Sequence, residues 1–127
     1  MNWRVKAMRS RMYGLTVSRH MDGDMKSLIQ LVPECGIDVV ESFSPAPLTR
    51  LEFGDAWDAW RDKVLIWGGI PSPVFEAHVS DAEFDSWLAG MFAHIGSDGR
   101  IILGIGDQAM GPTLMDRVRR LSHMLGR

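Results

Sequence analysis

The sequence predicts an α/β protein with a four-stranded parallel sheet. Four apolar runs along the 127 residues show no regular polar alternation: Leu15–Val17, Ile37–Val40, Val64–Trp67 and Ile101–Ile105. Continuous aliphatic runs of this length are typical of strands buried on both faces. A helical pattern follows each run, and strands that alternate with helices favour a parallel sheet with right-handed crossovers. Four such units can form a small open sheet or half of an eight-stranded barrel.

Composition and charge limit the classes of protein to which the chain can belong. Hydrophobic residues make up 46% of the chain and charged residues 24%, the balance of one soluble globular domain. A net charge of −2 gives no reason to expect a nucleic-acid partner. No apolar run approaches the roughly 20 residues that a membrane helix needs. The lone Cys35 excludes an internal disulfide, so we expect a cytoplasmic protein without a membrane partner.

Residues 1–13 are predicted to form a leading helix, because Val5, Met8 and Met12 recur at helical spacing. The first 20 residues carry only basic charges, which also resembles a transit peptide, but no small-residue cleavage site follows. We therefore expect a solvated basic helix face. Residues 1–127 are treated as one partial-barrel domain, with the four β-α units in residues 14–127.

The predicted helices differ in how clearly the sequence indicates their ends and their apolar faces. Four apolar residues from Met25 to Val32 share one face, and Gly36 can end that helix, although Pro33 interrupts its last turn. Residues 49–52 and 80–83 both match a capping box. The helix after Ser80 has the most regular apolar stripe, formed by Phe84, Trp87, Leu88, Met91 and Ile95. A last helix is predicted to open near Pro112, a residue favoured in first turns.

Polar side chains follow the first apolar run as it enters a loop. His20 and Asp22 are two residues apart, so both can point to the same side, and Asp24 follows closely. Glu41 and Asp107 end two other predicted strands. Because parallel strands present their carboxyl ends at one edge, these residues are candidates for a shared site. The alternative is that Asp22 and Asp24 cap the next helix and Glu41 forms a salt bridge.

Four segments of the chain resemble the C-terminal half of the uroporphyrinogen decarboxylase superfamily, which includes cobalamin-linked methyltransferases. They read HMDGD from His20, CGIDVVESFSPAP from Cys35, WRDKVLIWGGIP from Trp60 and IILGIGD from Ile101. Their order and spacing match the family from about Gly14 to the C-terminus. The resemblance implies a (β/α)8 TIM-type barrel, of which this chain holds the last four β-α units.

The chain departs from the family pattern at positions that bind zinc or act in catalysis in the known branches. In the methyltransferase branch a His-x-Cys pair and a later cysteine bind zinc, whereas here the two cysteine positions correspond to Asp22 and approximately Asp107. A thiolate zinc site is therefore not supported. The decarboxylase branch has a histidine near the position of Asp107 and draws arginines from its N-terminal half. The chain is most similar to relatives that carry His-x-Asp-Gly-Asp.

The site predicted from residues and resemblance has three parts. The predicted catalytic residues are His20, Asp22, Glu41 and Asp107. His20, Asp22 and Asp107 are also the predicted ligands of a divalent metal such as zinc, for which one imidazole and two carboxylates are suitable. Glycines permit close approach of a ligand to the backbone, so Gly69 and Pro71 after the third strand are the predicted substrate contacts.

The predicted function is that of the C-terminal half of a uroporphyrinogen decarboxylase-like enzyme, a lyase or transferase. It would act in decarboxylation or methyl transfer on a small organic substrate. The alternative is a non-catalytic half-barrel remnant or a binding or assembly module. A half barrel leaves exposed sheet edges, so the expected partner is a missing N-terminal half or a second copy of the chain.

Overall fold

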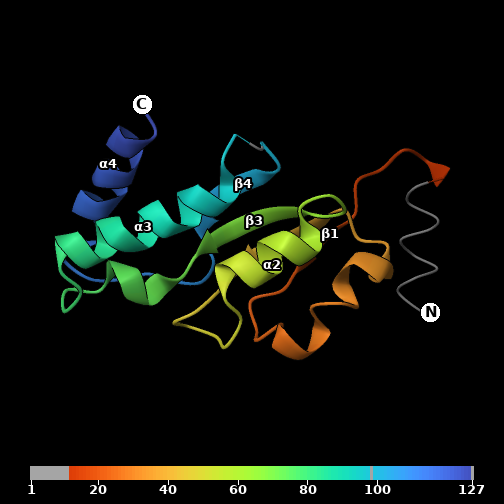
Figure 1. Ribbon diagram of the computed structural model, residues 1–127, viewed down its shortest axis with the longest axis horizontal. Helices are drawn as coiled ribbons and strands as arrows, with labels where there is room; N and C mark the ends of the chain where they lie inside the picture. Colours follow the sequence, from red (N-terminus) through yellow and green to blue (C-terminus); the bar gives the residue numbers. More distant parts are fainter. Residues whose placement is uncertain (1–11, 98, 127) are drawn as a thin grey trace.

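The computed structural model describes residues 12–97 and 99–126 and has a four-stranded parallel sheet (Figure 1). Its strands, in chain order and in spatial order, are β1 (Ser18–His20), β2 (Val39–Phe43), β3 (Leu65–Ile70) and β4 (Ile101–Ile105). Each strand pairs in parallel with the next. The α/β class and the four-stranded parallel sheet are thus confirmed. The predicted leading helix lies almost wholly outside the described residues.

The first strand differs from its prediction. It covers Ser18–His20 rather than Leu15–Val17, and it is exposed along its whole length. Leu15 is 59% exposed. Among the described strands β1 is at the edge and pairs with β2 alone, so the apolar run before it is not buried on two faces as predicted. The expectation of a doubly buried strand here is wrong.

Three α-helices are described: α2 (Phe53–Trp60), α3 (Asp81–Ile95) and α4 (Leu114–Met124). Short 3₁₀ helices lie at η1 (Lys26–Leu28), η2 (Val32–Cys35) and η3 (Ser72–Phe75). Among the described helices, none has both the length and the apolar character needed to cross a membrane.

The helix predicted after β1 is replaced by the two short turns η1 and η2. Pro33 lies at the start of η2, and it lacks the N–H group that would continue an α-helical hydrogen-bond ladder from the preceding turn. Gly36 ends η2 in the left-handed conformation with φ of 75°, as predicted for a helix-ending glycine.

Only one of the two predicted capping boxes forms. The Ser80 hydroxyl accepts from the Glu83 amide at the start of α3, and the Glu83 carboxylate accepts from the Ser80 amide. In the other candidate, the Thr49 hydroxyl instead donates to the Ser44 carbonyl at 2.8 Å. The box predicted there is wrong, because α2 begins later, at Phe53, with Glu52 as its cap and no side-chain hydrogen bond.

The core lies on one face of the sheet, where α2 and α3 cover it (Figure 1). Trp57 and Trp60 of α2 are almost completely buried, and Trp60 packs edge-on against Phe43 of β2 with 5.1 Å between ring centroids. The Trp60 indole N–H also donates to the Ile29 carbonyl, which fixes the loop after β1. Both tryptophans therefore belong to the core.

The opposite face of the sheet is open within the described residues. One row of paired residues crosses it from β1 to β4: His20, Glu41, Trp67 and Ile102. Trp67 and Ile102 are each 46% exposed, whereas their neighbour Ile66 on the other face is fully buried. The prediction that Trp67 packs in the interior is therefore wrong. Helices cover one face of the sheet, and no described element buries the other.

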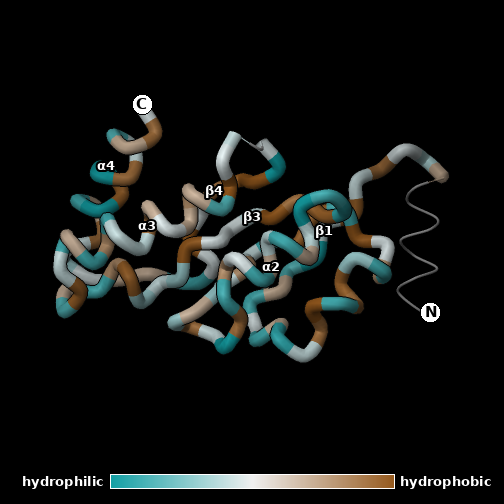
Figure 2. Tube along the Cα trace, viewed as in Figure 1, coloured by the Kyte–Doolittle hydropathy of each residue, from teal (hydrophilic) through white to brown (hydrophobic). Residues whose placement is uncertain are grey.

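Arg117 anchors α4 to the rest of the molecule. Its guanidinium is 3% exposed and donates to the carbonyls of Val74, Glu76 and Val79 in the segment between β3 and α3. It also lies over the Phe84 ring at 5.2 Å from the centroid. Apolar and polar residues alternate along the rest of α4 (Figure 2), whose apolar side remains partly exposed. The helix is therefore held mainly by a polar anchor.

Replacing Arg117 with alanine should lower the free energy of unfolding by roughly 2–4 kcal/mol, because three carbonyls lose a buried donor. Arg119→Ala on the same helix is the matched control. Arg119 is exposed and pairs with Asp116 one turn away, so its loss should cost no more than about 0.5 kcal/mol. Urea denaturation of both variants measures the difference, and equal stabilities would contradict the anchoring role.

Gly68 allows β2 and β3 to approach each other at a bulge in their pairing. The register shifts between Glu41 and Phe43, and Ser42 between them has a positive φ of 64°. Gly68 itself has φ of 128°, and a Cβ atom there would lie 2.8 Å from the Phe43 carbonyl oxygen. Only a residue without a side chain fits this position.

Gly68→Ala should destabilise the protein by roughly 1–3 kcal/mol, because the added methyl group meets backbone atoms in a strained conformation. Gly90→Ala is the matched control, since no atom lies within 4 Å of a Cβ built there in the interior of α3. That variant should be stabilised by about 0.5–1 kcal/mol through helix propensity. Opposite signs in thermal unfolding are expected, and the same sign would refute the account.

Candidate functional site

His20 and Glu41 form a close pair at the carboxyl ends of β1 and β2. They are direct partners in the parallel register, so their side chains leave the same face of the sheet. The Nδ1 atom of His20 lies 2.5 Å from the Glu41 Oε2 atom. On the other side of the ring, Nε2 lies 3.6 Å from the Asp22 Oδ2 atom. The structure therefore brings together three of the four predicted catalytic residues.

The pKa of His20 is raised above its ordinary value of 6.5, mainly by the hydrogen bond to Glu41. Desolvation opposes this increase, and the negative charges of Glu41 and Asp22 raise the pKa further. The His20 side chain is 64% exposed, so water screens these interactions. The pair therefore keeps the imidazolium form to higher pH than an unpaired histidine would.

The arrangement is suited to proton transfer. A carboxylate can only accept, so Nδ1–H donates to Glu41, and this fixes the tautomer and orientation of the ring. The Nε2 atom then faces the Asp22 side and can give or take a proton there. A histidine oriented in this way by a carboxylate has the geometry that general acid or base catalysis requires.

Asp24 has the structural role that the sequence left open. Its carboxylate accepts the Lys26 amide at 3.0 Å at the start of η1 and pairs with the Arg50 Nε atom at 2.5 Å. The Arg50 hydrogen bond, followed by the Lys26 amide, lowers the pKa of Asp24. Asp24 therefore ties the loop after β1 to the loop before α2.

Asp107 is not brought to His20 within the described chain. It follows β4, whereas His20 ends β1, and these strands are the two edges of the sheet. After β4 the chain turns back toward the end of β2, where the Gly106 carbonyl accepts from the Ser42 hydroxyl. The Asp107 carboxylate accepts the amide of the next residue, Gln108, at 2.6 Å.

The predicted metal ligands do not fit one ion. Among the described residues, no three histidine, cysteine, aspartate or glutamate side chains are placed to hold a metal. Glu41 and Asp22 lie on opposite nitrogens of the His20 ring, so the three groups do not converge on a single point.

Gly69 and Pro71, the predicted substrate contacts, are both buried at the end of β3. A Cβ atom at Gly69 would lie 3.2 Å from the Phe53 ring of α2, so this glycine makes room for the core. Neither residue is paired in register with the His20 row. Their contact with a substrate stays a prediction.

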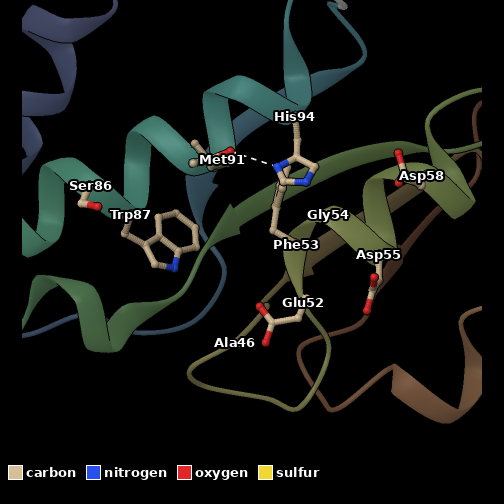
Figure 3. Close-up of a pocket in the computed structure, with 11 residues that line it drawn as sticks. Ala46, Glu52, Phe53, Gly54, Asp55, Asp58, Ser86, Trp87, Met91 and His94 are labelled. Atoms are coloured by element: carbon tan, nitrogen blue, oxygen red, sulfur yellow. Dashed lines mark hydrogen bonds between the residues drawn. The ribbon is translucent and has the colours of Figure 1, made fainter.

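A cavity of about 370 Å³ between α2 and α3 was not predicted (Figure 3). Its walls carry acidic side chains from the start of α2 and ring side chains from both helices: Glu52, Asp55, Asp58, Phe53, Trp87 and His94. The His94 Nδ1–H donates to the Gly90 carbonyl at 3.0 Å, and its ring meets Phe53 edge-on. The three-residue spacing of the acids was the available sequence signal, but it is also typical of a solvated helix face.

No family model, curated protein or solved structure matched the chain in the three comparisons made with known proteins. The geometry of the candidate site is therefore the basis for assigning its chemistry.

Glu41→Gln should lower the pKa of His20, because the carboxylate that stabilises the imidazolium is lost. Since the folded-state pKa lies above 6.5, protonated His20 stabilises the fold below that pH, and this contribution disappears as pH rises through the folded pKa. The variant should lose this pH-dependent stabilisation. NMR titration of the His20 ring protons measures the pKa directly. Asp116→Asn, on α4, is the control and should leave the His20 titration unchanged.

Proposed function

We propose that this chain is the C-terminal half of a (β/α)8 barrel enzyme of the uroporphyrinogen decarboxylase type. It acts on a small organic substrate by decarboxylation or methyl transfer, with His20 as the proton-transfer group and Glu41 as its orienting partner. The hydrogen-bonded His20–Glu41 pair at the carboxyl ends of adjacent parallel strands is the observation that carries the proposal. Barrel enzymes hold their catalytic groups at this end of the strands.

The stagger of the sheet supports the half-barrel part of the proposal. His20 is the last residue of β1, but its register row reaches β4 at Ile102, three residues before that strand ends. A closed eight-stranded barrel of this type has a total shift of about eight residues, or about four for each half. The strand ends of this sheet therefore step by nearly the amount that half a barrel requires.

The burial of only one face of the sheet is the second observation that supports the half-barrel proposal. In a barrel, helices cover the outside of the sheet while the inner face is filled by side chains from the opposite strands. Here α2 and α3 cover one face, and Trp67 and Ile102 on the other face are each 46% exposed. Completion by the opposite strands would bury both residues.

The proposed decarboxylation balances in atoms, electrons and protons. Loss of CO₂ from a substrate carboxylate leaves an electron pair on carbon, and the His20 Nε2–H supplies the proton that forms the new C–H bond. The neutral imidazole is then reprotonated from solvent. Glu41 orients the ring and stabilises the imidazolium, so the acid form persists to higher pH than in an unpaired histidine.

A non-catalytic role is the second candidate, and one observation favours it. The His20 and Asp22 side chains are 64% and 58% exposed, so the described chain alone excludes little water from the site. Catalytic groups normally act in a site from which water has been excluded. On this reading the half barrel is a binding or assembly module.

The two candidates are distinguished by turnover. The native protein would be incubated with small carboxylic acids labelled with ¹³C at the carboxyl group, and with donors carrying a ¹³C-methyl group. NMR then detects released ¹³CO₂ or a transferred methyl group. His20→Ala should lower the rate roughly 100- to 10,000-fold, the usual contribution of a general acid. His123→Ala, which removes an exposed histidine from α4, should leave it unchanged.

The pH profile tests the role of the pair separately. If His20 acts as an acid, turnover falls as pH rises through its pKa, and Glu41→Gln should move this fall to lower pH. Full turnover by the His20→Ala variant would rule out the proposed role. No turnover by the native protein with either class of probe would favour the non-catalytic module.

A further inference from the structure

We propose that two copies of this chain close into one barrel, with β4 of each copy pairing in parallel with β1 of the other. This inference rests on the proposed half-barrel function and names its partner. β1 and β4 are the two edges of the described sheet, and each pairs with only one described strand. A two-fold axis along the barrel would make both new junctions identical, so the assembly closes at two copies.

The register of the new junction follows from the stagger. Because the row from His20 reaches β4 at Ile102, two equal halves with a total shift of about eight residues each contribute about four. Ile102 then lies opposite Thr16 of the second copy, and Gly104 lies opposite its Ser18. The direction of the shift is the one that brings the end of β4, at Ile105, level with the end of β1.

The two edges are complementary in apolar character in this register. Leu15 and Val17 of one copy fall opposite Ile101 and Leu103 of the other. Leu15 is 59% exposed, and the sequence pattern is that of a buried strand. An open groove of about 410 Å³ lies along β4 and is lined by Ile101, Ile102, Leu103 and Leu125. The segment before β1 of the second copy has the apolar side chains to fill it.

Light scattering during size-exclusion chromatography tests the stoichiometry across the micromolar range. The expected mass is twice the 14.2 kDa of one chain. A chain that stays at 14.2 kDa, or that forms an open series of larger oligomers, overturns the proposal. The titration of His20 is independent of this result, so a monomer with an intact His20–Glu41 pair overturns self-pairing and leaves the proposed function standing.

Disulfide trapping tests the register. In a Cys35→Ser background, Thr16→Cys and Ile102→Cys would be combined in one chain. The junction places their Cα atoms about 4.8 Å apart between copies, within the range of roughly 4.4–6.8 Å that a disulfide spans. Within one chain the same residues lie on opposite edges of the sheet. Oxidation should therefore give a covalent dimer.

Ser18→Cys combined with Ile102→Cys is the matched control, because it moves one thiol two residues along the strand. The Cα atoms would then be about 8 Å apart, too far for a disulfide. Equal cross-linking of the two pairs, or none with Thr16→Cys, would contradict the predicted junction. Selective cross-linking of the first pair supports it.

Discussion

The packing of α2 and α3 against one face of the parallel sheet is the contact on which the rest of the structure depends. Trp57 and Trp60 supply much of its volume, and both are almost completely buried. Trp60 also holds the Ile29 carbonyl, so the same side chain that fills the core positions the loop after β1. A core of large rings fills one side of the sheet, and no described element covers the other side.

This one-sided core explains why the candidate site lies where it does. β2 is held by Phe43 against Trp60, so Glu41, two residues earlier, is fixed on the uncovered face. β1 has no such anchor and is held by its pairing with β2 and by the Asp38 carboxylate, which accepts the Val17 amide at 2.8 Å. The His20–Glu41 pair thus joins a rigid strand to an edge strand.

Much of the fold could be predicted from sequence because apolar runs and capping residues report local structure. Ser80 and Glu83 form the predicted cap, and Gly36 adopts the predicted left-handed conformation. Burial was harder to predict, because an apolar run does not show whether a covering element exists. Trp67 and Leu15 are apolar and exposed for this reason.

The site was predictable only in part. Parallel strand ends place Glu41 beside His20, as expected, whereas the distance to Asp107 depends on strand order, which the sequence does not contain. The cavity beside His94 was missed because its walls come from two helices whose packing is a tertiary property.

The openness of the site sets how strongly its charges can act. An ion pair exposed to water is worth little, because solvent screens it and competes for its hydrogen bonds. The same pair becomes much stronger when water is removed, provided that its geometry is already fixed. His20 and Glu41 have that geometry in the described chain. Covering the open face would therefore strengthen an existing interaction rather than create one, and the chemistry of the pair depends on what closes the sheet.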